Sequence, residues 1–181
     1  MSASLADYVN LLGSAEIDEL RALAGALKRP DVVMVNSTAV GGGVAEILDR
    51  LVPLACELGL NIRWEVIVGG TEFFEVTKGF HNALHGGPNE LREDAFDVFL
   101  AYNQRNRERL DLDAAYVVIH DPQPAALVSG RARGDRHWIW RCHIDLSRPN
   151  AEVWGFLRPF VEQYDGAIFS SPAFAQQQAA P

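Results

Sequence analysis

Apolar runs and amphipathic helical patterns alternate along most of this chain. Five continuous apolar runs are bounded by turn residues, which is typical of strands buried on both faces of a parallel sheet. They span residues 31–36, 62–68, 115–120, 137–143 and 166–170. Three segments between them carry apolar residues at helical spacing. These segments span residues 44–58, 71–110 (interrupted at 86–88) and 153–164.

Two short helices are also expected before the first strand. They span residues 2–12 and 15–28. Ser14 is the expected N-cap of the second helix, and Pro30 ends the unit. The last residues are rich in Gln and Ala and have no apolar pattern, so we expect a frayed tail. The chain therefore divides into an N-terminal helical extension (residues 1–30), one domain (31–175) and the tail (176–181).

The alternation of strands and helices predicts an α/β fold. A Rossmann-like, doubly wound and mostly parallel sheet is the arrangement that this order favours. In such a sheet, ligands bind beyond the carboxyl ends of the strands. The residues that follow each predicted strand are therefore the first place to look for chemistry.

The composition narrows the classes of partner. With 24 acidic and 16 basic side chains among 181 residues, the formal charge is −8, and the basic residues are scattered. A surface for nucleic acid or anionic lipid needs clustered Lys and Arg. The two cysteines lie in apolar contexts, and no signal peptide or apolar run of about 20 residues is present. We expect a reduced, cytoplasmic protein that binds neither nucleic acid nor a membrane.

Three consecutive glycines, Gly41, Gly42 and Gly43, lie between the first strand and the following helix. Small residues at a helix N-terminus let an anionic ligand approach unpaired N–H groups. The spacing does not fit a dinucleotide fingerprint, because Glu46 occupies the place of the third glycine, and no P-loop Gly-Lys-Ser/Thr follows. A tight turn without a ligand explains the same residues.

Two successive strands end in ionisable clusters. The first cluster contains His120 and Asp121, and the second contains Arg141, His143 and Asp145. Neighbouring parallel strands would bring both clusters to the edge that also carries the glycines. Carboxylates that accept and an Arg that donates hydrogen bonds suit a hydroxyl-rich or phosphorylated ligand. Strand-end caps and salt bridges are the alternative.

Two further patterns are ambiguous. His81 and His85 have the spacing of metal ligands on a helix, but Asn82 replaces the Glu of the H-E-x-x-H pattern and no third ligand is evident. We therefore predict no metal site. Trp138 and Trp140 share one face of a strand, and either a core position or a sugar platform fits them.

Four segments resemble the N-terminal half of the trehalose glycosyltransferring synthases, which are retaining glycosyltransferases of family 4 with the GT-B fold. They span residues 36–46, 73–84, 118–124 and 138–147. The resemblance runs from about residue 31 to Ala175. It implies two Rossmann-like domains, glucose transfer from a nucleotide-diphosphate glucose to glucose, and trehalose as the product, with no metal or other cofactor.

The resemblance also implies roles for particular residues. Asp121 and His143 match the catalytic positions. The substrate-binding set comprises the glycine loop that approaches the donor, the residues beside the catalytic pair, and part of another family segment: Gly41, Gly42, Gly43, His120, Arg141, Asp145, Lys78 and Asn82. Glucose or trehalose is the implied ligand of this set.

The family's second domain, which carries the nucleotide-sugar pocket, is absent from these residues. We therefore expect an acceptor-side domain that is inactive alone and binds the donor together with a C-terminal domain. Two alternatives stay open. One is half of a trehalose phosphorylase, and the other is a non-catalytic sugar-binding or regulatory module. A homo-oligomer is possible, because the face that meets the partner domain would be apolar and exposed.

Overall fold

The computed structural model describes residues 4–88, 90–131 and 134–175. Five strands form one sheet in the order β2-β1-β3-β4-β5, and every neighbouring pair is parallel. The strands are β1 (Asp31–Asn36), β2 (Asn61–Val66), β3 (Tyr116–His120), β4 (His137–Cys142) and β5 (Gly166–Phe169). This arrangement confirms the predicted α/β fold and is that of a Rossmann-like domain.

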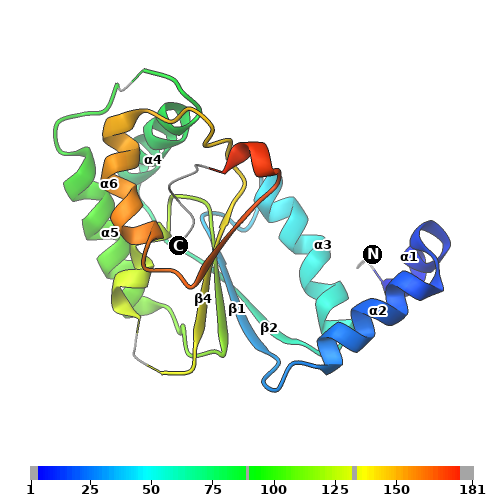
Figure 1. The fold of residues 1–181 in the computed structure, drawn as a ribbon. Coiled ribbons are helices and arrows are strands. Elements are labelled where there is room, and N and C mark those ends of the chain that lie inside the picture. The colour runs from blue at the N-terminus through cyan, green and yellow to red at the C-terminus, as the bar shows by residue number, and fades with distance from the viewer. Residues whose placement is uncertain (1–3, 89, 132–133, 176–181) are drawn as a thin grey trace.

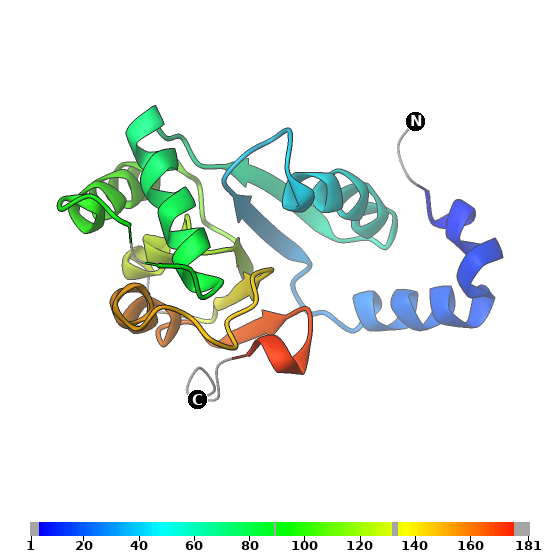
Figure 2. The same cartoon turned by 90° about the horizontal axis from the view of Figure 1, so that it is seen from above.

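Helices flank the sheet on both faces (Figures 1 and 2). α4, α5 and α6 lie on one side and α3 lies on the other, while α1 and α2 project from the α3 side. The helices are α1 (Leu5–Leu12), α2 (Ser14–Gly25), α3 (Gly43–Glu57), α4 (Thr71–Leu84), α5 (Ala95–Arg109) and α6 (Ala151–Val161). Two short 3-10 helices complete the fold, η1 (Ala125–Gly130) and η2 (Pro172–Phe174).

The main hydrophobic core lies between the sheet and α4, α5 and α6. Alternate residues of β4, Trp138 and Trp140, point into it and are 3% and 1% exposed. Both tryptophans are therefore core residues, which excludes the sugar-platform alternative. Phe73, Phe80 and Phe99 from the helix layer pack in the same core with no exposed area. This core holds the central strands in register, and the register fixes the positions of the residues that follow them.

The opposite face of the sheet is only partly covered. α3 packs beside β2, whereas β5 carries Ile168 with half of its surface exposed. Tyr116, Ile139 and Ile168 line a shallow hollow of about 480 Å³ on β3, β4 and β5. No helix in the described residues is both long and apolar enough to cross a membrane.

Most of the expected elements are present, but several differ at their ends or in the connections between them. Ser14 is the first residue of α2, and Gly13 takes the N-cap position with φ at 98°. η1 was not expected between the third and fourth strands. α6 begins earlier than predicted because the Asn150 side chain accepts from the backbone N–H groups of Glu152 and Val153. The predicted tail, residues 176–181, lies outside the described residues.

Candidate active site

The topology brings three candidate site segments to one edge of the sheet. β1 pairs with β3, and β3 pairs with β4, so their carboxyl ends lie side by side. The glycine loop follows β1, His120 ends β3 beside Asp121, and the segment from Arg141 to Asp145 ends β4 and continues beyond it. The predicted convergence of the two ionisable clusters is confirmed. We call this edge the rim.

The glycine loop is open at the rim. Gly41 and Gly42 adopt positive φ values of 72° and 102°, and Gly42 is the N-cap of α3. A Cβ added at Gly41, Gly42 or Gly43 would meet nothing within 4 Å. The loop is held from within, because the Asn36 amide donates to the Thr38 carbonyl at 2.8 Å. A ligand could therefore approach the backbone of this loop. No neighbouring group in the described residues would clash with a side chain at any of the three positions.

Asp121 has an unusual backbone and a partly buried carboxylate. Its φ is 66°, the only positive value among non-glycine residues in the described part of the chain. The turn lets its N–H donate to the Arg141 carbonyl at 2.9 Å, while its Oδ1 accepts from the His143 N–H at 2.7 Å. Burial raises the pKa of Asp121 to about 6, against the opposing effects of the His143 hydrogen bond and the Arg141 charge. The carboxylate therefore joins the ends of β3 and β4.

His120 and His143 contact each other directly. Nδ1 of His120 lies 3.1 Å from Nε2 of His143, and the rings stack at 18° with centroids 5.4 Å apart. His120 is 4% exposed, whereas His143 is half-buried. Burial, followed by the charges of His143 and Arg141, lowers the pKa of His120 to about 3. Burial and Arg141 lower the pKa of His143 to about 4. Both rings are therefore neutral at neutral pH.

Arg141 and Asp145 are both engaged locally. The Arg141 guanidinium donates to the Ser170 hydroxyl at 2.8 Å and to the backbone carbonyls of Cys142 and Ile168. Asp145 accepts from the Ser147 N–H at 2.8 Å, and this bond is the main cause of its lowered pKa. Arg141 thus contributes a fixed positive charge that is tied to β5. Ser170 was missed by the sequence reasoning, and its place at the end of the fifth predicted strand is the signal that could have found it.

Lys78 and Asn82 lie apart from these contacts. Both are exposed on α4, and among the described residues neither forms a hydrogen bond or ion pair with the rim. His81 on α4 and His85 at its C-cap meet edge to face with ring centroids 4.7 Å apart, and burial lowers the pKa of His81. The described part of the chain contains no group of three or more His, Cys, Asp or Glu side chains arranged to hold a metal.

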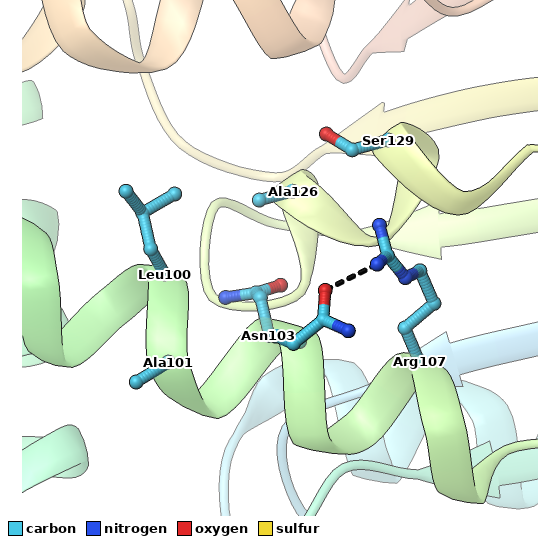
Figure 3. A pocket seen from close by; sticks show the side chains of 7 residues that line it. Leu100, Ala101, Asn103, Arg107, Ala126 and Ser129 are labelled. Carbon is cyan, nitrogen blue, oxygen red and sulfur yellow. Dashed lines mark hydrogen bonds between the residues drawn. The ribbon is translucent and has the colours of Figure 1, made fainter.

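A separate hollow of about 330 Å³ lies between α5 and η1. Figure 3 shows Asn103 and Arg107 projecting from α5 toward Ala126 and Ser129 of η1. The Arg107 side chain is bonded to Gln104, and the Asn103 amide donates to the Phe99 and Gln123 carbonyls. None of the rim residues lines this hollow, so the rim remains the candidate active site.

Comparison with known proteins places this geometry in a family. The family profile described as "Trehalose synthase, N-terminal domain" matches residues 34–176 and so includes the whole rim. The chain belongs to this family. It is 49% identical to the trehalose synthase of Pyrococcus horikoshii over 96% of this chain, and 42% identical to that of Rubrobacter xylanophilus over 92%. A trehalose phosphorylase of Pleurotus pulmonarius is more distant, at 27% identity over 84% of the chain.

The chain spans about two fifths of the length of the trehalose synthases that it matches, 42% and 41% for these two. The trehalose synthase family resemblance stated from the motifs is thereby confirmed for the N-terminal domain. The rim of this domain carries the open glycine loop, Asp121 and the His120–His143 pair.

Proposed function

We propose that this chain is the acceptor-side domain of a retaining GT-B glycosyltransferase of family 4. The whole enzyme would transfer glucose from a nucleotide-diphosphate glucose to glucose and release trehalose. One observation carries the proposal: Asp121 and His143 meet beside an open glycine loop in a domain of the trehalose synthase family. Oriented acceptors and donors at one edge are what recognition of a polyhydroxylated ligand requires.

Each group at the rim has a place in this function. The Asp121 carboxylate accepts a hydrogen bond from a sugar hydroxyl, and His143 contacts the ligand beside it. The backbone of Gly41, Gly42 and Gly43 approaches the donor at the α3 N-terminus, where N–H groups favour anionic oxygens. The chemistry depends on positioning and on stabilising the departing diphosphate, and no metal takes part. A C-terminal domain supplies the nucleotide-sugar pocket.

We assign supporting roles to the other residues that were predicted to bind substrate. Arg141 is fixed by Ser170, so we assign it an electrostatic role at the rim. His120 is buried behind His143 and reaches a ligand only through that ring. Asp145 lies beyond these residues on the same segment. Lys78 and Asn82 would contact a ligand from α4.

A ligand titration of this chain tests the proposal. Adding glucose or trehalose to the 15N-labelled protein should shift amide resonances in residues 118–124 and 138–147. Asp121→Asn should weaken these shifts because a neutral amide replaces the charged acceptor, whereas the control Asp97→Ala, an exposed position on α5, should leave them unchanged. Shifts confined to α4 around His81 would place the sugar elsewhere and contradict the proposal.

The absence of a metal requirement is tested separately. Elemental analysis of the purified protein should find no stoichiometric metal, and a chelator should leave the melting temperature unchanged. Zinc lost together with stability would overturn this part of the proposal.

A trehalose phosphorylase is the second candidate function. The similarity to the Pleurotus pulmonarius enzyme favours this function. That similarity is weaker, however, with 27% identity compared with 49% for the Pyrococcus horikoshii synthase. Joined to a C-terminal domain, a phosphorylase would cleave trehalose with inorganic phosphate, whereas a synthase would need the nucleotide sugar. A module without catalysis would bind the sugar and do neither.

A further inference from the structure

The contact between His120 and His143 leaves one nitrogen of each ring without a hydrogen-bond partner in the described part of the chain. Nδ1 of His120 and Nε2 of His143 are joined at 3.1 Å. Nε2 of His120 is buried and has no hydrogen-bond partner among the residues that the structure describes. Nδ1 of His143 bonds to no described residue, and its ring is half-buried at the rim. The two rings therefore connect the interior, at Nε2 of His120, with the rim, where His143 is half-buried.

A single proton lies between the two joined nitrogens, because both rings are neutral at neutral pH. If Nε2 of His143 were the donor, His120 would carry its proton on Nε2, where a buried N–H would have no acceptor. If Nδ1 of His120 is the donor, Nε2 of His120 carries no proton. The buried group without a partner is then an acceptor lone pair on that nitrogen. Orphaned buried N–H groups are rarer in proteins than under-satisfied acceptors. The second arrangement is therefore favoured.

The geometry points to His120 as a positioning residue that donates from Nδ1 to Nε2 of His143 and so fixes the proton of His143 on Nδ1, where it serves as a hydrogen-bond donor to a ligand oxygen. This inference deepens the proposed function, on which it rests for the identity of the ligand. The tautomer itself is a property of the free protein.

The backbone around the pair supports this role. The His143 N–H is held by Asp121 Oδ1 at 2.7 Å, and Trp140 Nε1 donates to the Asp121 carbonyl at 2.9 Å. Arg141 is the cation whose charge acts on both rings, and it is fixed by the Ser170 hydroxyl. With its backbone held by Asp121 and its ring held by His120, His143 presents Nδ1–H in one orientation. A neutral ring whose Nε2 is already occupied donates a hydrogen bond and is not a general base.

The ring nitrogens report this arrangement directly by NMR. In long-range 1H–15N spectra of the labelled chain without ligand, Nδ1 of His143 should lie in the protonated range and Nε2 in the unprotonated range. The pattern should persist from about pH 8 to about pH 5, where an unperturbed histidine would take up a proton. Protonation at Nε2 of His143 in the wild-type protein would overturn the inference, and this measurement needs no variant.

His120→Leu removes the donor and keeps an apolar side chain in the buried position. In this variant, His143 should show averaged nitrogen shifts from two tautomers and should titrate within the same pH range. His85→Leu, at the C-cap of α4, is the matched control and should leave the His143 nitrogens unchanged. Unchanged His143 shifts in His120→Leu would show that His120 does not position the ring.

The two ideas can fail separately. A fixed Nδ1–H tautomer together with no response to glucose or trehalose would contradict the proposed function and leave the role of His120 standing. A sugar response at the rim with Nε2 of His143 protonated would do the reverse. On sugar binding, the Nδ1–H proton of His143 should move downfield in the wild-type protein and show no such movement in His120→Leu.

Discussion

Asp121 combines a left-handed backbone, a raised pKa and a hydrogen bond that joins two strand ends. Its φ of 66° lies in the left-handed region, which costs an ordinary residue about 1 kcal/mol and which Asp and Asn tolerate better than most. The turn directs its carboxylate back to the His143 N–H. The strained backbone at this position therefore allows a hydrogen bond that links the ends of β3 and β4. Strained residues of this kind cluster at functional sites.

Replacing Asp121 should separate its backbone role from its charge. Asp121→Ala loses the acceptor of the His143 N–H and tolerates the left-handed turn poorly, so we expect a loss of about 2–3 kcal/mol in the free energy of unfolding. Asp121→Asn keeps both features and should stay within about 1 kcal/mol of the wild type. Urea unfolding at neutral pH measures both. Equal losses in the two variants would contradict this assignment.

The two histidines should make the protein less stable as the pH falls. Their pKa values in the fold are about 3 for His120 and about 4 for His143, whereas the unfolded chain takes up these protons near the reference pKa of 6.5. Between about pH 7 and about pH 5, linkage removes about 2 kcal/mol through His120 and, after allowance for solvent screening, about 1 kcal/mol through the half-exposed His143.

Asp121 opposes this loss over the same interval. Its pKa is raised to about 6 in the fold, so the native state takes up a proton there before the unfolded chain does, which returns about 1 kcal/mol. The net loss should be about 2 kcal/mol between about pH 7 and about pH 5, and His120→Leu should remove most of it. Urea unfolding of both proteins at the two pH values provides the comparison. A wild-type protein that is more stable at the lower pH would contradict the burial of His120.

At the scale of elements, the sequence predicted the strands better than the connections between them. Continuous apolar runs bounded by turn residues indicate buried strands. All five strands accordingly begin and end within two residues of their expected limits. η1 was missed because its buried residues, Ala125 to Val128, form too short a run to show helical periodicity. The paired rings of His120 and His143 depend on side-chain rotamers, which a sequence pattern does not specify.

The glycine loop can be tested as an element because its three members have different backbones. Gly42 has φ at 102°, so Gly42→Ala should lower the free energy of unfolding by about 1 kcal/mol. Gly43 is the first residue of α3, has no positive φ and faces open space, so Gly43→Ala should leave the stability unchanged or slightly higher.

The same pair of variants distinguishes a ligand loop from a simple turn. If the loop backbone approaches the donor phosphates, the Cβ of Gly43→Ala should weaken binding of a nucleotide-diphosphate glucose to the two-domain enzyme without a loss of stability. Calorimetric titration and thermal unfolding of that enzyme measure the two effects. Unchanged affinity in a stable Gly43→Ala variant would mean that the glycines serve only the turn into α3.

At the scale of the whole molecule, the rim would supply only part of what the proposed glucose transfer requires. The described residues supply a fixed carboxylate, a neutral imidazole and an open helix N-terminus, while the Arg141 guanidinium is already bonded to Ser170 and two carbonyls. A departing diphosphate needs stabilising cations or donors where its charge develops. The matched trehalose synthases are more than twice as long as this chain, and we assign those groups to their remaining length.

This 181-residue chain alone should therefore form no trehalose from nucleotide-diphosphate glucose and glucose. Holding donor and acceptor together in one cleft can supply roughly 7–11 kcal/mol of barrier reduction, which one domain cannot provide. Adding a separately expressed C-terminal part of a family member should restore part of the activity, measured as trehalose released. His143→Ala should then abolish the restored activity, while the control Asp97→Ala should retain it. Turnover by the isolated chain at the rate of a full-length relative would require the whole catalytic machinery to lie within these residues, and would contradict the two-domain mechanism.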